Sequence, residues 1–422
     1  MKRFAVLICL FLLWGCAAGI DYGHLARQMD AGDCQGALDL LEGQRYGANQ
    51  ELLYLMDAGM LNMRCENHGA AVDYFNRADD LARDLWTLSV SREAASFFWN
   101  DYTRAYRGED FERAMIHLMA AISYIEMGDR DAALVSFRRL DSLLRELNDR
   151  YEKKNVYNED AFARYLSGIL YEADGSLDDA FIAYFRAYEI YRDYEKHYGT
   201  PAPSTLVEDL RRTGIMVDRI DDLTKLGIDP NASFEDHHGA GSGYGKVVFI
   251  AFRGNAPKKV ENAIIIPAAS GPLKFSFPHY VVQRPTPGRK MIILESTENR
   301  YNVETYLVQD INRIAVKNLH DREGRVMARM MARSLAKQVL IDRAARETGI
   351  DALRIGMNIA NLFVERADTR SWRTLPGEIH LARVFVPAGS YIVNTVSGYG
   401  GETGLEKVDV KAGETEFVFQ MM

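Results

Sequence analysis

The chain has 422 residues, which is too long for one ordinary hydrophobic core and predicts two or three domains. Its 47% hydrophobic and 26% charged residues are typical of folded proteins and argue against an intrinsically disordered chain. The net charge is −8 and no long basic block offsets it, which argues against a nucleic-acid-binding protein.

The chain begins with two basic residues and an apolar run, FAVLICLFLLW, at residues 4–14. A helix needs roughly 20 apolar residues to span a bilayer, so this run is too short for a transmembrane helix and has the length of a signal-peptide core. We therefore predict export into a compartment where disulfides can persist.

The segment LWGC resembles the lipobox of bacterial lipoproteins through Leu13, Gly15 and Cys16. The resemblance implies that residues 1–15 are a removable signal peptide and that Cys16, carrying a diacylglycerol, begins the mature chain. Ala17, in place of Asp, resembles the outer-membrane sorting pattern of Gram-negative lipoproteins, which implies an anchored protein that faces the periplasm. A plain secretory signal is the alternative and leaves a soluble periplasmic or secreted protein.

Residues 16–226 carry an internal repeat. In its best copies a small residue is followed after twelve positions by Ala, then after four by an aromatic residue and after three by Ala. The pattern resembles tetratricopeptide repeats (TPRs), which are helix pairs of about 34 residues. The residues expected to pack these repeats are Gly59, Ala71, Phe75, Ala78, Ala121, Ala133, Phe137, Gly168, Ala180, Tyr184 and Ala187. We predict a TPR-like α-solenoid here, with a generic helical bundle as the alternative.

Cys34 and Cys65 lie near the turns of the first two copies. Stacked repeats place successive turns side by side, so a disulfide between them is geometrically possible, and two free buried thiols are the alternative. The four cysteines form neither a C-x-x-C pair nor a Cys/His cluster, so we predict no metal site among them.

The composition changes after residue 226. Residues 227–245 are rich in Gly, acids and His and are expected to be a linker. Residues 246–366 are predicted to form an α+β domain, because β-branched runs such as KVVFIAF and KMIIL indicate strands. Residues 302–347 indicate a helix with a break or kink at Gly324. Short strands separated by turns predict a small β module at 367–422.

Within that helix the segment RVMARMMARSLAKQ is basic and rich in methionine. We expect Val326, Met330 and Leu335 to lie on a sheet, with a membrane-surface or partner-binding helix as the alternative. The predicted fold class is α+β and multidomain, with an N-terminal TPR-like α-solenoid followed by a β-rich α+β C-terminal region.

No motif predicts catalysis. GAGSGYG at 239–245 precedes a strand rather than a helix and lacks the lysine of a phosphate loop, and EDHH at 235–238 lies in the linker, where metal ligands are poorly preorganised. Neither a metalloprotease helix motif nor a nucleophile elbow is present. We therefore predict no catalytic residue, no metal and no cofactor.

Two groups of residues are candidates for partner binding. Tyr124, Tyr165 and Tyr171 are expected either in a groove of the helical half or in its repeat packing. Arg370 and Trp372 have the residue types of binding hot spots, and the alternative is a structural clasp with Trp372 buried and Arg370 paired to Asp368.

Three segments together resemble one family of uncharacterised bacterial TPR-containing lipoproteins. They are GEDFERAMIHLMAAISYIEMGDRDAALVSFRRLD at 108–141, YLSGILYEADGSLDDAFIAYFRAYEI at 165–190 and ADTRSWRTLPGEIHLARVFVPAG at 367–389. The resemblance implies an envelope role and no assigned activity. We expect a non-enzymatic, membrane-tethered scaffold for protein or peptide partners in the cell envelope. The alternatives are a cell-wall or polysaccharide enzyme or glycan-binding module in the C-terminal half, and a subunit of a secretion or surface-assembly system.

Overall fold

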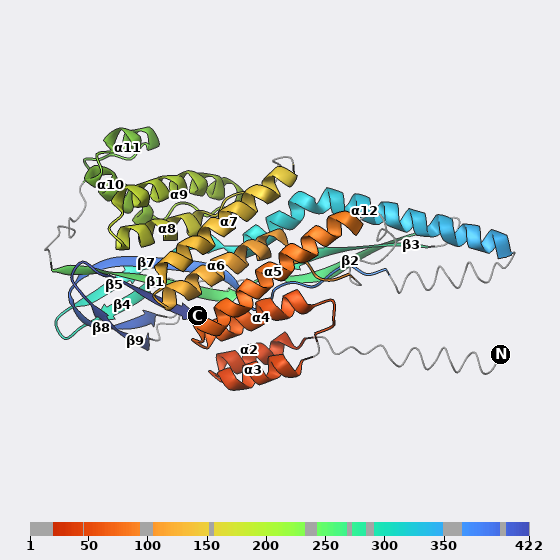
Figure 1. Cartoon of the computed structure of the whole chain (residues 1–422), viewed down its shortest axis with the longest axis horizontal. Helices are drawn as coiled ribbons and strands as arrows, with labels where there is room; N and C mark the ends of the chain where they lie inside the picture. Colours follow the sequence, from red (N-terminus) through yellow and green to blue (C-terminus); the bar gives the residue numbers. More distant parts are fainter. Residues whose placement is uncertain are drawn as a thin grey trace.

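The computed structural model of the protein shows helix pairs packed on β-sheets (Figure 1). It describes residues 20–44, 46–92, 104–151, 156–232, 243–267, 272–283, 291–348, 365–396 and 402–421. The helices before the first strand are α2 (Tyr22–Asp30), α3 (Cys34–Gly43), α4 (Glu51–Arg64), α5 (His68–Arg92), α6 (Asp110–Glu126), α7 (Arg130–Arg150), α8 (Ala161–Ala173), α9 (Leu177–Tyr198), α10 (Ser204–Met216) and α11 (Ile220–Leu226). Successive helices pack against each other as antiparallel pairs.

The turn inside each pair needs a residue with positive φ, which glycine adopts at least cost. Gly32, Gly128 and Gly175 have φ values of 72°, 77° and 79° in three of these turns. Glu66 takes the same conformation, with φ of 59°, in the turn between α4 and α5. The pairs therefore share one turn geometry even where the glycine is missing.

The residues expected to pack the repeats are all buried. The distance between the two helices of a pair explains why the first residue of the repeat pattern is small. A Cβ atom at Gly59 would lie 2.4 Å from the ring of Phe75, and one at Gly168 would lie 2.4 Å from the ring of Tyr184. Only glycine therefore lets α4 lie this close to Phe75 of α5 and α8 this close to Tyr184 of α9, whereas Ala121 takes this place in the α6–α7 pair.

The strands of the described residues form two four-stranded sheets and one hairpin. Their bounds are β1 (Tyr244–Asn255), β2 (Lys258–Ile266), β3 (Leu273–Val281), β4 (Met291–Glu295), β5 (Arg300–Glu304), β6 (Tyr306–Asp310), β7 (Pro376–Pro387), β8 (Gly389–Val396), β9 (Glu402–Val410) and β10 (Thr415–Met421). The first sheet has the order β10-β1-β7-β6 and the second β5-β4-β8-β9, while β2 pairs with β3. Within the first sheet β1 runs parallel to β10 and antiparallel to β7.

The predicted boundary between 246–366 and 367–422 falls inside both four-stranded sheets. Each of these sheets takes two strands from either side of it. The physical reason is that a buried strand must find hydrogen-bonding partners for its main chain, and it takes them from any part of the sequence that supplies a matching strand. The two segments therefore form one structural unit.

The first sheet is covered on both faces, which explains the continuous apolar run KVVFIAF in β1. Val248, Ile250 and Phe252 belong to the core shared with the helices. Val247 and Phe249 belong to a second core, between the two four-stranded sheets. Alternate side chains of a strand point to opposite faces of its sheet. The first sheet, to which β1 belongs, is therefore the middle layer between the helices and the second sheet.

Helix α12 (Ile311–Thr348) is shorter at its start than predicted and continuous at its middle. Residues 302–310 form part of β5 and all of β6, because their aromatic and β-branched residues pair with β4 and β7. Of the break or kink predicted at Gly324, the break is wrong, because α12 is one continuous helix and one glycine costs a helix only about 1 kcal/mol. Figure 1 shows α12 and the β2–β3 hairpin extending together from the body.

The prediction for the side chains of α12 is confirmed in part. Met330 is buried and Val326 is half-buried, but Leu335 is 54% exposed and the prediction for it is wrong. The β2–β3 hairpin covers only one side of the extended part of α12, so side chains on the other side of this part stay exposed.

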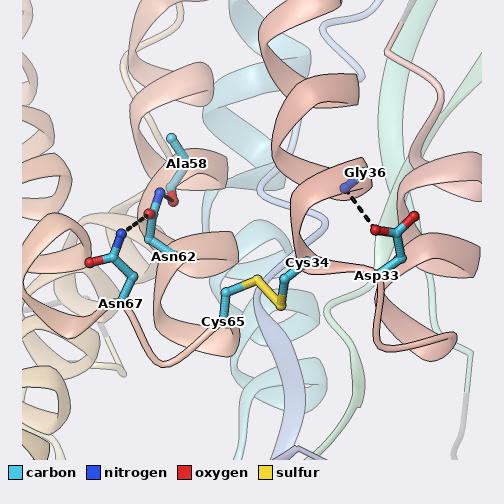
Figure 2. The surroundings of a disulfide bond; sticks show 7 residues. All are labelled: Asp33, Cys34, Gly36, Ala58, Asn62, Cys65 and Asn67. Atoms are coloured by element: carbon cyan, nitrogen blue, oxygen red, sulfur yellow. Dashed lines mark hydrogen bonds between the residues drawn. A yellow bond between two sulfur atoms is a disulfide. The ribbon is translucent and has the colours of Figure 1, made fainter.

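A disulfide joins Cys34, at the start of α3, to Cys65, just after α4 (Figure 2). The two Cα atoms are 5.7 Å apart, within the range of ordinary disulfides. Asp33 caps α3 by accepting a hydrogen bond from the Gly36 amide at 2.9 Å. The bridge therefore ties the first helix pair to the second at their turns.

Candidate functional site

A cavity of about 590 Å³ opens where the helix pairs meet α12. Its walls come from residues 104–110 before α6, from the ends of α5 and α7, from β2 and β3, from α12 and from residues 366–370. We call it the arginine pocket, because its cationic residues are Arg104, Arg107, Arg150, Lys259, Arg322, Arg325, Arg329, Arg333, Arg366 and Arg370.

The bottom of the arginine pocket is a buried ion cluster. Lys259 and Arg322 both donate to the carboxylate of Glu109, and Arg322 also lies 3.3 Å from Asp110. Burial alone would raise the pKa of Glu109, but the charges of Lys259 and Arg322 outweigh it and hold that pKa below its usual range. Glu109 is therefore ionised and neutralises part of the positive charge.

Aromatic rings hold several of the arginine side chains. Arg325 lies over the ring of Tyr151 at 4.3 Å, and Arg150 lies over Trp86 at 4.6 Å. Cation–π contacts orient a guanidinium group without consuming its hydrogen-bond donors. Arg325, like its neighbour Arg329, is exposed at the rim.

The charge of the arginine pocket is opposite to that of the chain. Ten cationic residues line it against three carboxylates, those of Glu109, Asp110 and Asp368, which leaves a net charge of +7 in a chain of net charge −8. A concave surface of one sign focuses the electrostatic field and attracts ligands of opposite charge. Guanidinium groups also match the geometry of carboxylate and phosphate oxygens.

Arg370 belongs to both the pocket and a structural clasp. It donates to Asp368 at 2.6 Å and to the main-chain oxygens of Asn49 and Arg104, each at 2.9 Å. Trp372 is 1% exposed, packs against Phe75 and is closed to any partner. The geometry of both residues is that of the structural clasp, in which Arg370 pairs with Asp368 and Trp372 is buried.

The three tyrosines expected in a groove lie elsewhere. Tyr165 is fully buried and its hydroxyl donates to Asp209 at 2.9 Å, so it is part of the packing and cannot bind a partner. Tyr124 and Tyr171 are half-buried and pack against the helical core. None of the three lines the arginine pocket.

A second buried ion cluster joins the helices to the first sheet. Glu172 of α8 accepts hydrogen bonds from Arg212 at 2.6 Å and from Arg383 of β7 at 2.8 Å, and Lys246 of β1 donates to it as well. Burial alone would raise the pKa of Glu172, but these three cations hold it well below its usual range. All of these groups are paired with one another and largely buried. The cluster therefore has a structural role and connects the helices to the first sheet.

The sequence did contain a signal for the arginine pocket. Arg322, Arg325, Arg329 and Arg333 recur every three or four residues, which places them on one face of a helix. What the spacing could not indicate is that residues 104–110 and 366–370 bring further arginines to the same face.

Several predicted features lie outside the described residues: the signal peptide, Cys16, the EDHH segment and most of GAGSGYG. Within the described ranges, no group of three or more His, Cys, Asp or Glu residues could hold a metal ion. In the same ranges no helix is long and apolar enough to cross a membrane.

Neither a protein-family model nor a curated protein matches the chain. Among solved structures, the crystal structure of BtubC (BKLC) from P. vanneervenii is similar with a TM-score of 0.31 and 15% identity, over 50% of this chain and 82% of that one. A likeness at this score supports no statement about fold or function.

Proposed function

We propose that the protein is a non-enzymatic scaffold that binds an anionic group of a cell-envelope partner in the arginine pocket. The observation that carries this proposal is the net charge of +7 on the lining of one cavity in an acidic chain. The ligand chemistry is a phosphate or a cluster of carboxylates, because both accept paired hydrogen bonds from guanidinium groups.

The helix pairs suit a scaffold role as TPR-like repeats. The proposal is supported by their shared turn geometry and by the Gly–aromatic contacts at Gly59 and Gly168. Such arrays offer extended surfaces to partners.

The proposal also places the protein at a membrane through a lipid on Cys16. It rests on the lipobox resemblance of LWGC. A tether raises the local concentration of the scaffold, so that weak contacts become useful. Labelling cells with a fatty-acid analogue tests this part: the wild-type chain should be labelled, and Cys16→Ser should abolish the label. Equal labelling of both would contradict the anchor.

Calorimetric titration with pyrophosphate and with a glutamate-rich peptide tests the pocket. Arg325→Glu combined with Arg329→Glu should weaken binding of at least one probe by about tenfold or more, because two exposed rim cations become anions. Arg138→Glu is the matched control, an exposed arginine on α7 outside the pocket, and should leave binding unchanged.

Salt dependence separates charge recognition from other contacts. Affinity should fall as ionic strength rises, since exposed charges are screened over about 10 Å at 0.1 M salt. Failure of both probes to bind, or equal effects of the rim and control variants, would remove the basis of this function.

A further inference from the structure

The two four-stranded sheets end in four edge strands, and three of these edges are blocked. β6 is short, carries a bulge and is covered by α8. β5 exposes Arg300 and Glu304, and β9 exposes Lys407 and Asp409. Short strands, bulges, coverage and charges are the usual means by which sheets prevent further strands from adding.

The fourth edge, β10, has few of these protections. Its sequence, TEFVFQM, contains a single charged residue and neither lysine nor proline. Its faces are covered, because Phe417 and Phe419 pack on the core shared with the helices while Val418 packs between the sheets. Among the described strands only β1 pairs with it.

The register shows which main-chain groups of β10 point to its open edge. The Lys246 amide donates to the Glu414 carbonyl at 2.9 Å, and a parallel ladder then bonds every second residue. Residues 416, 418 and 420 therefore direct their N–H and C=O groups to β1. Thr415, Phe417 and Phe419 direct theirs away from it.

A groove of about 670 Å³ lies beside the start of this edge, and its lining is acidic. It is bounded by Thr415–Phe417 and by the turns that follow α6 and α8. Its carboxylates are Glu126, Asp129, Asp131, Asp174 and Glu416, against one cation, Arg130, which pairs with Asp174 at 2.8 Å. Five carboxylates and one guanidinium leave a net charge of −4.

We propose that β10 accepts an extended, basic segment of a partner protein, which adds to the first sheet as a further strand. Main-chain bonds to Thr415, Phe417 and Phe419 supply the pairing, and alternate basic side chains meet the carboxylates of the groove. A second copy of this chain is disfavoured as the partner, because it would bring a groove of the same negative charge to this one.

This inference is independent of the proposed function, since no residue of the groove lines the arginine pocket. The test uses the full mature chain and a labelled peptide of about eight residues that alternates Lys with Thr or Val. A peptide with Glu in place of each Lys is the matched probe. Binding is followed by fluorescence anisotropy and by amide hydrogen exchange of β10.

We expect the basic peptide to bind about tenfold more tightly than the acidic one. It should slow hydrogen exchange at Phe417 and Phe419, whose amides point to the open edge. Glu416→Lys should weaken binding by about fivefold, while Asp73→Lys, an exposed charge reversal on α5, should have no effect.

Phe417→Pro and Phe417→Ala form the decisive pair, because both lose the ring and only proline loses the outward N–H. Proline should weaken binding about tenfold more than alanine, with both variants checked for native melting temperature. Equal binding of the two peptides, unchanged exchange at β10 or equal affinity of the two variants would overturn the proposal. So would concentration-dependent dimerisation through β10 in sedimentation.

Discussion

Replacing the packing glycines tests the central claim about the helix pairs. Gly168→Ala places a methyl group 2.4 Å from ring atoms of Tyr184, where ordinary contacts begin near 3.4 Å. The ring cannot retreat easily, because Tyr184 is fully buried and its hydroxyl donates to Glu172 at 2.7 Å.

The expected magnitude follows from two opposing effects. Overpacking of this kind costs about 1–3 kcal/mol. Alanine in a helix interior recovers up to about 1 kcal/mol relative to glycine. A contact as short as 2.4 Å places the cost of overpacking in the upper part of its range, at about 2–3 kcal/mol, so Gly168→Ala should lower the free energy of unfolding by about 1–2 kcal/mol. Gly59→Ala should behave similarly, because its Cβ atom would lie 2.4 Å from Phe75.

Gly324→Ala is the matched control in α12. Its Cβ atom would meet nothing within 4 Å, so only the helix propensity changes and stability should rise by about 1 kcal/mol. Urea unfolding followed by far-ultraviolet circular dichroism measures all three variants. If Gly168→Ala and Gly324→Ala shift stability in the same direction, the close helix approach is refuted.

Three further predictions concern bonds that join distant segments. Replacing Cys34 and Cys65 by Ser should cost about 3.7 kcal/mol, the chain-entropy estimate for their separation of 31 residues, and a reductant should lower the melting temperature of the wild type but not of this variant. Arg383→Met should cost about 3 kcal/mol in urea unfolding, because it leaves buried carboxylates short of a partner, whereas the exposed control Arg138→Met should stay within about 0.5 kcal/mol. Asp57 of α4 accepts hydrogen bonds from Tyr46 at 2.9 Å and from Thr374 at 2.7 Å. Burial raises its pKa to about 6 from 3.8, so the folded protein binds the extra proton, and the stability that this proton contributes is lost as pH rises from 4 through 6. Asp57→Asn should reduce the fall in unfolding free energy between pH 4 and pH 7, and Asp141, whose pKa burial also raises to about 6, should account for part of the slope that remains.

Each of these predictions can fail clearly. If reductant leaves the melting temperature of the wild type unchanged, the disulfide between Cys34 and Cys65 is contradicted. Equal stabilities of the two arginine variants would show that the Glu172 cluster does not hold the sheet to the helices. A pH profile that Asp57→Asn leaves unchanged would mean that another group carries the titration.

Much of the helical half follows from local patterns. The spacing of Gly59, Ala71 and Phe75 predicts a helix pair because small and aromatic residues twelve to sixteen positions apart meet only across a tight helical turn. The β-branched run KVVFIAF likewise predicts strand β1. Residues 302–310 were assigned wrongly because a short apolar segment satisfies helical and strand periodicity alike, and pairing with β4 and β7 decides between them.

The helix turns, the packing glycines and the apolar strand of the middle layer can be predicted from the sequence, because each shows as a pattern within about sixteen neighbouring residues. The pairing of the cysteines, the open strand edge and the places where charge gathers follow from the three-dimensional arrangement of distant segments. The arginine pocket draws on residues as distant as Arg104 and Arg370, and the groove on Asp131 and Glu416. Such clusters arise because long-range strand pairing and helix packing bring distant segments together, and no local periodicity encodes that choice.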